Sequence, residues 1–262
     1  MKGYLSLLKG TYMARGAYRF TFLFTLTGNL LYIALLYFLW ASIYRQSETL
    51  RGMTFNQAFV YVALAGSIFV LFKTWTEWGM SRSIVNGAIV VDLIKPLDYQ
   101  LQMLSRAAGF ALTNLVLITA PSVLVLFLAF GVGISPSIGL VFFPMGLLLA
   151  FLISFNLDYI VGLSGFYTES LWGISMTKEI ITSLLSGALV PLQFFPEAAQ
   201  SILRLLPFQA IYHVPLTMVT SPVDLQACLR LLAVQAFWVV ALFALSRLVY
   251  NKAVKVLTVN GG

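Results

Sequence analysis

The residues of this chain best suited to chemistry are one serine and the only histidine. Ser164 stands in the sequence Gly162-Leu163-Ser164-Gly165, and His213 follows much later in the chain. A serine becomes a nucleophile when a base within hydrogen-bond distance takes its proton. Whether this pair can react therefore depends on the elements that place the two residues.

Other catalytic and metal-binding patterns are missing from the sequence. It contains no GxxxxGK[ST] phosphate loop and no HExxH zinc motif. One cysteine, Cys228, and one histidine cannot form a Cys/His metal site of three or four ligands. We therefore expect no metal site and no cofactor bound by this chain itself.

The composition indicates an integral membrane protein. Hydrophobic residues make up 60% of the 262 residues, charged residues only 10%, and the mean hydropathy is +0.92. Soluble domains average roughly 25% charged residues, so a soluble fold could not cover its surface here. The net charge of +7 would suggest nucleic acid in a soluble protein. In a membrane protein it reflects basic cytoplasmic loops, and we expect no nucleic-acid partner.

The uncharged intervals predict an all-α integral membrane protein that forms a single transmembrane domain over residues 1–262. A membrane span needs about 20 apolar residues. Residues 1–18 are expected to form an interfacial helix, and the proline-rich stretch 192–223 short re-entrant helices in an outer cap. Two cytoplasmic segments, 81–97 and 163–175, are longer than simple connections require. The six predicted transmembrane helices cover residues 20–44, 54–78, 100–130, 137–160, 172–191 and 225–250.

The basic residues orient these helices. With the N-terminus inside, 12 of the 16 Lys and Arg residues fall in inner segments and 4, namely Arg45, Arg51, Arg204 and Arg230, in outer ones. Both termini are therefore expected in the cytoplasm. The same topology puts Ser164 at the cytoplasmic end of the fourth helix and His213 on the outer side. We therefore predict that Ser164 is not a nucleophile and that the chain has no catalytic residue.

Two stretches resemble bacterial ABC exporter permeases of the ABC type-two class. Leu93-Ile94-Lys95-Pro96-Leu97 is similar to their LL-R/K-P-L element after the second helix. Ser186–Pro196, followed by Leu206-Pro207-Phe208 and Pro215, resembles their outer element after the fifth helix. The resemblance in length, helix number and loop placement covers essentially the whole chain.

This resemblance implies a multi-pass permease of the bacterial inner membrane with an ABCG-like (type V) arrangement. Such permeases pair with a second copy or a related permease, within membrane lipid. Separate ATP-binding cassette subunits beneath them bind ATP and magnesium. The main coupling segment would surround Arg82–Lys95, with a second contact at Tyr167–Trp172. The implied ATPase-coupling residues are Arg82, Ile84, Ile89, Asp92, Leu93, Lys95, Pro96, Glu169 and Trp172.

The resemblance also places a solute path at the dimer axis, along the second and fifth helices. Its implied lining residues are Phe59, Phe69, Phe72, Leu185 and Leu189. A path without charges favours an apolar or amphipathic solute, or a cation held by aromatic faces. Pro191 is expected to end the fifth helix, because proline lacks an N–H and clashes with the preceding turn. The predicted outer gate consists of Leu189, Pro191, Leu192, Phe194 and Phe195.

Two other functions remain open from the sequence. One is a secondary transporter driven by an ion gradient, although the absence of a visible internal repeat argues against it. The other is an intramembrane serine protease, because Gly162–Gly165 resembles the GxSG signature of the rhomboid proteases. An ATPase partner would distinguish the exporter from both.

Overall fold

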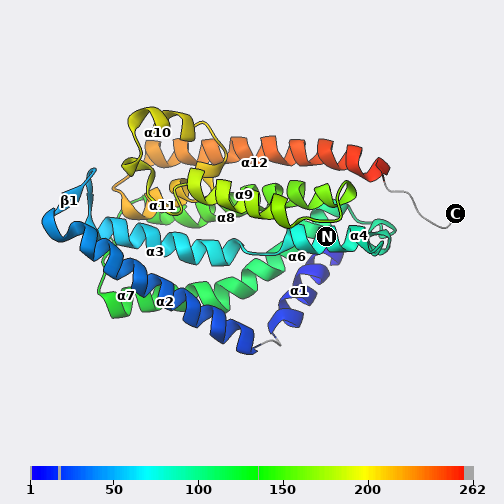
Figure 1. Cartoon of the computed structure of the whole chain (residues 1–262), viewed down its shortest axis with the longest axis horizontal. Coiled ribbons are helices and arrows are strands. Elements are labelled where there is room, and N and C mark those ends of the chain that lie inside the picture. The colour runs from blue at the N-terminus through cyan, green and yellow to red at the C-terminus, as the bar shows by residue number, and fades with distance from the viewer. Residues whose placement is uncertain (1, 17–18, 135, 257–262) are drawn as a thin grey trace.

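The computed structural model describes residues 2–16, 19–134 and 136–256, and these residues form an elongated helical bundle (Figure 1). Met1, Ala17 and Tyr18 of the predicted interfacial helix, and residues 257–262 of the predicted cytoplasmic C-terminus, lie outside the described residues. The long helices are α1 (Lys2–Gly16), α2 (Arg19–Ile43), α3 (Phe55–Phe72), α6 (Tyr99–Asn114), α7 (Ala120–Phe130), α8 (Gly139–Leu163), α9 (Trp172–Leu185) and α12 (Leu225–Ala253). The shorter helices are α4 (Thr76–Val85), α5 (Ile89–Leu93), α10 (Glu197–Leu203) and α11 (His213–Thr220). The single-turn elements are η1 (Tyr44–Gln46), η2 (Leu115–Thr119), η3 (Ser164–Phe166), η4 (Leu192–Phe194), η5 (Phe208–Ala210) and η6 (Val254–Val256).

Within the described residues, five helical stretches are long and apolar enough to cross a membrane: Phe20–Gln46, Phe55–Val85, Tyr99–Phe130, Gly139–Phe166 and Leu225–Val256. They coincide with five of the six predicted spans. The third stretch passes from α6 to α7 through a π-helical turn, η2. Pro121 follows in the first turn of α7 and cannot donate the usual backbone hydrogen bond.

The fifth predicted span, residues 172–191, is not one spanning helix. Helix α9 has 14 residues. At 1.5 Å per residue this is about 21 Å, short of the roughly 30 Å of a bilayer core. The helix ends at Leu185, so the prediction that Pro191 ends it is wrong. The chain turns instead at Gly187, whose φ of +81° suits glycine.

The second predicted span is interrupted where α3 ends. The backbone leaves the helix at Lys73, and Trp75 adopts the left-handed conformation with φ of +57° before α4 begins. The Asn114 side-chain amide donates to the carbonyl oxygens of Val70 (2.9 Å) and Lys73 (3.3 Å). Broken helices persist inside membrane proteins when neighbouring groups satisfy the freed carbonyls in this way.

The all-α prediction misses a small hairpin. Strands β1 (Thr49–Leu50) and β2 (Met53–Thr54) pair antiparallel beyond α2. The two residues between them, Arg51 and Gly52, both have positive φ, as in a type I′ turn. Thr54 then caps α3 through a reciprocal capping box with Gln57.

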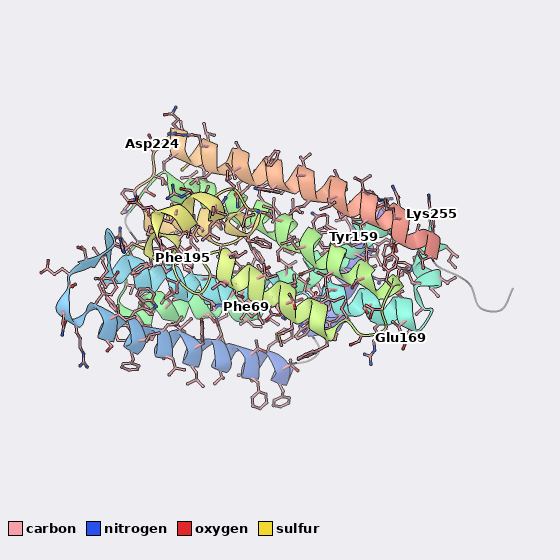
Figure 2. The ribbon with its side chains drawn as sticks, turned by 45° about the horizontal axis from the view of Figure 1, so that its top comes forward. Phe69, Tyr159, Glu169, Phe195, Asp224 and Lys255 are labelled. Carbon is pink, nitrogen blue, oxygen red and sulfur yellow. The ribbon has the colours of Figure 1, made fainter. Side chains whose placement is uncertain are left out.

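The bundle has two distinct ends. Helices α1 and α4 and the end of α12 lie at one, whereas β1 and α10 lie at the other (Figure 1). Figure 2 likewise shows Glu169 and Lys255 at the first end, and Phe195 and Asp224 at the second. We call these the α4 end and the hairpin end. After α9 the chain has passed from the α4 end to the hairpin end, although its helix is short.

Candidate functional site

A groove opens between α2, α3 and α9. Its cavity volume is about 490 Å³, and apolar atoms make up most of its wall. Asn29 and Tyr32 from α2 face it, as do Phe69 and Val70 from α3. Asn29 is held in place because its amide donates to the Ser122 hydroxyl at 2.8 Å. The groove therefore has a mainly apolar wall with a few fixed polar groups, as is typical of ligand pockets.

Charged residues close the end of the groove nearest to the α3–α4 break. Glu179 of α9 lines the groove and forms an ion pair with Lys73. The Lys73 ammonium also lies 4.8 Å from the centre of the Trp75 ring. The expectation of an uncharged path therefore fails at this end, because the chain break brings Lys73 against α9.

Beside this pair lies a buried charge cluster, which we define as Glu77, Asp158 and Lys178. The Lys178 ammonium donates to Asp158 at 2.5 Å and to Glu77 at 3.2 Å. The Ser175 hydroxyl donates to the same Glu77 oxygen at 3.1 Å. The sequence interpretation did not include this cluster as a site. The sequence nevertheless contained a clue to it, because Asp158 and Lys178 are charged residues within long apolar segments.

The structure brings only part of the predicted solute path together. Phe69 and Leu189 line the groove. Phe72 is buried and faces the smaller cavity around the charge cluster. Phe59 is fully buried between other aromatic rings, including Tyr37 and Phe130, and it does not line the groove. Leu185, at the end of α9, is half-buried and lies outside the groove lining.

The first predicted coupling segment is firmly anchored to the bundle. The Asp92 carboxylate accepts two hydrogen bonds from Arg106 of α6, at 2.8 and 3.0 Å, and one from Lys95 at 2.7 Å. Burial opposes ionisation of Asp92, but these cationic donors outweigh it and hold its pKa below the usual range. Arg247 likewise outweighs the burial of Asp98 and lowers the pKa of that carboxyl.

The anchoring decides which coupling residues face outward. Ile89 is fully buried and Ile84 nearly so, hence neither side chain is presented to a partner in this structure. Leu93 is half-buried, as is Lys95, which is already paired with Asp92, whereas Arg82 and Pro96 are exposed. The exposed apolar residues of the segment are Val85, Val90, Val91 and Ile94. We call these four residues the α4–α5 patch.

The second predicted coupling segment lies directly against the first. At Gly165 of η3, an added Cβ would lie 2.9 Å from the Ser81 Cα on α4, so this contact requires glycine. Glu169 and Trp172 follow on the surface, where Trp172 is 63% exposed. Both segments therefore form one continuous face at the α4 end.

The predicted outer gate lies at the hairpin end. Pro191 and Leu192 are buried, and the half-buried Phe194 packs edge-on against Trp40 of α2 at 5.4 Å. Phe195 is half-buried, whereas Leu189 is 53% exposed and reaches the groove. The short helices α10 and α11 follow within residues 192–223, as predicted, and α11 is mostly buried against α3 and α8.

Ser164 and His213 do not meet. The Ser164 hydroxyl donates to the Val161 carbonyl at 2.7 Å, a bond within its own helix end. The His213 ring instead lies near the Tyr61 hydroxyl (3.5 Å) and the Thr217 hydroxyl (3.4 Å). Without a base beside it, Ser164 lacks the geometry of a nucleophile. Among the described residues, no group of three or more His, Cys, Asp and Glu side chains is placed to hold a metal ion.

Comparison with known proteins agrees with this picture of a multi-pass membrane protein. Residues 30–261 match the family model described as "ABC-2 family transporter protein". A comparison with curated proteins finds no match. Members of the matched family are transmembrane permeases without ATPase activity, and the family implies a complex with an ATPase. Because the match covers most of its length, the chain belongs to the ABC-2 family of transporter proteins.

Proposed function

We propose that this chain is the transmembrane subunit of an ATP-driven exporter in a bacterial inner membrane. It moves an apolar, amphipathic or cationic solute out of the cytoplasm. Separate ATP-binding cassette subunits bind ATP and magnesium and supply the energy. The observation that carries the proposal is the groove between α2, α3 and α9, which runs beside an anchored face at the α4 end.

The character of the groove supports this class of solute. Phe69 and Tyr32 offer aromatic faces, whereas the Glu179 carboxylate at one end is already paired with Lys73. Aromatic faces attract ammonium groups as well as apolar surfaces. A solute with an apolar body and one cationic group would therefore match the mainly apolar, aromatic wall.

A second permease would complete the groove. Helix α9 has only one buried residue, Ser175, and exposes Ile174, Ile180 and Leu184 among its large apolar side chains. Several exposed apolar side chains of α9 therefore lie uncovered beside the groove between α2, α3 and α9. A second copy of this chain, or a related permease, placed along α2 and α9 would cover both and put the solute path on the dimer axis.

The orientation follows from the charge distribution. The basic residues concentrate in the segments of the α4 end, which we assign to the cytoplasm. In a Cys228→Ser background, single cysteines at Arg51 and Glu197 should react with an impermeant maleimide from outside. A cysteine at Arg82 should react only after the membrane is opened. The reverse labelling pattern would contradict the orientation.

The decisive experiment tests the groove through ATP hydrolysis. Gly28 lines the groove, and no atom lies within 4 Å of the position that its Cβ would occupy. Gly28→Phe should therefore insert a ring into the groove without breaking the helix and abolish solute-stimulated hydrolysis by the co-purified ATPase. Gly28→Ala is the matched control, because it leaves the groove open, and should keep that stimulation. Equal stimulation in both variants would exclude this groove as the solute path.

The same preparation separates the remaining alternative. An ion-gradient carrier would transport without any co-purifying ATPase, and its flux would follow the ion gradient. Failure to recover an ATPase from the native membrane, together with gradient-driven flux, would overturn the exporter proposal.

A further inference from the structure

We propose that the charge cluster of Glu77, Asp158 and Lys178 is a proton-binding site, in which one of the two carboxyl groups is protonated and the other pairs with Lys178. The site joins three helices, because Glu77 lies on α4, Asp158 on α8 and Lys178 on α9. This proposal does not depend on the proposed export function.

The charges around the site do not balance unless a proton is present. The charged groups that line its cavity are Lys73, Glu77, Asp158, Lys178 and Glu179. Lys73 and Glu179 neutralise each other as an ion pair. Among the described residues that line the cavity, Lys178 then remains as the only cation for two carboxylates, so this set carries one excess negative charge. An uncompensated buried charge is costly, and a buried carboxyl group takes up a proton instead.

The burial and hydrogen bonding of the site point the same way. The side chains of Glu77 and Asp158 are only 2% and 8% exposed. Glu77 Oε1 accepts hydrogen bonds from Ser175 and Lys178, whereas Glu77 Oε2 is buried without a hydrogen-bond partner among the described residues. A buried carboxylate oxygen without a donor is unfavourable because its negative charge is unpaired, and protonation replaces that charge with a neutral hydroxyl group.

Among the described residues, no other neighbouring helix places a cation in the lining of this cavity. The segment before α11 contributes Tyr212, which is neutral. On the other side of α4, Arg106 and Lys95 are already paired with Asp92.

A proton fits the site better than a metal ion. The cavity volume is about 40 Å³, enough for water but small for a hydrated cation. Lys178 also occupies the position between the two carboxyl groups, at 2.5 Å from one and 3.2 Å from the other. A metal ion bound there would have to displace this ammonium group.

The site makes the position of α9 sensitive to pH. Ser175, the only buried residue of this helix, and Lys178 both contact Glu77. Loss of the proton would leave three carboxylates against two ammonium groups at the junction of α9 with α4 and α8. We therefore expect α9 to be held less firmly when the proton is lost.

Infrared spectroscopy of the full-length protein in lipid nanodiscs tests the proposal directly. A protonated buried carboxyl group has a carbonyl stretch distinct from that of a carboxylate, and the band shifts in D₂O. The wild-type protein should show this band at neutral pH and lose it at high pH. Glu77→Gln and Asp158→Asn should each remove it, because the one remaining carboxylate then pairs with Lys178. Glu48→Gln, which changes an exposed carboxylate in the hairpin, is the matched control and should retain it.

Stability measurements supply an independent readout. If the folded chain holds one proton more than the unfolded chain, its unfolding equilibrium constant should rise up to tenfold per pH unit. This rise should begin at about pH 4–5, where unfolded carboxyl groups lose their protons, and stop at the pH where the folded chain loses its own. Either amide variant should remove this dependence, and the double variant should lower the thermal midpoint, because Lys178 then has no anionic partner.

Three results would overturn the proposal. The first is a wild-type spectrum without the protonated band, and the second is a band that survives both amide substitutions. The third is a thermal midpoint that responds to sodium, measured against choline at constant ionic strength, and loses this response in Glu77→Gln. That result would assign the site to a metal cation.

Discussion

The α4–α5 patch offers the sharpest test of how this permease contacts its ATPase. Val91 and Ile94 are the most exposed members of the patch, at 59% and 75%. They lie on a segment that the Asp92–Arg106 pair holds against α6. Contiguous exposed apolar side chains are typical of interaction sites, and we propose that the α4–α5 patch is one. We expect Val91→Ala/Ile94→Ala to weaken binding of the ATPase without unfolding the permease.

The structure sets the size of the effect. Valine to alanine removes two carbons, and isoleucine to alanine removes three. Burial contributes about 0.8 kcal/mol per CH₂ group. Scaled by the exposed fractions of Val91 and Ile94, the loss is about 2.7 kcal/mol for the two substitutions together. This corresponds to a dissociation constant roughly 100-fold higher.

The assay is a titration of purified ATPase against the permease in nanodiscs, followed by light scattering or surface binding. Leu128→Ala/Val141→Ala is the matched control. It removes the same number of carbons from side chains that are 75% and 72% exposed on membrane-spanning helices. The control should bind the ATPase like the wild type. If folded Val91→Ala/Ile94→Ala binds the ATPase with unchanged affinity, this reasoning is refuted. Glu169 and Trp172 then become the next candidates for the ATPase contact.

Three further predictions concern other parts of the fold. Gly109→Val should detach α1 from α6, because an added Cβ would lie 2.6 Å from the Leu8 carbonyl oxygen. The substitution should lower the folding stability by about 1–3 kcal/mol, and proteolysis of α1 should accelerate. The carboxyl pKa values of Asp92 and Asp98 are lowered in the folded chain, so the stability they contribute is present above pH 4–5 and lost as the pH falls below about 4. Acid unfolding followed by circular dichroism should shift to higher pH in Asp92→Asn. Ser164→Ala should leave solute-stimulated ATP hydrolysis intact, and labelling of Ser164 by a fluorophosphonate would contradict this expectation.

The sequence predicted the features that depend on composition and on local chain chemistry. Few charges and long apolar intervals were enough to predict a helical membrane protein and five of its long helices, because a span must satisfy its own backbone. The motif around Lys95 and Pro96, with the outer element after Ser186, was enough to indicate the ABC-2 family, which the family match confirms. The separation of Ser164 from His213 also followed from their places along the chain.

Only the tertiary structure decided where helices break and which side chains meet. Asn114, on α6, stabilises the break after Phe72 because its side-chain amide donates to the carbonyl oxygens of Val70 and Lys73. The local sequence around the break does not encode this contact. The Asp92–Arg106 pair anchors α5 in an orientation in which Ile89 is buried and Val91 is exposed. The short segments α4 and α5 have too few residues for periodicity to determine which face is buried. Glu77, Asp158 and Lys178 lie far apart in the sequence, and only the packing of α4, α8 and α9 gathers them into one buried, charge-unbalanced cluster.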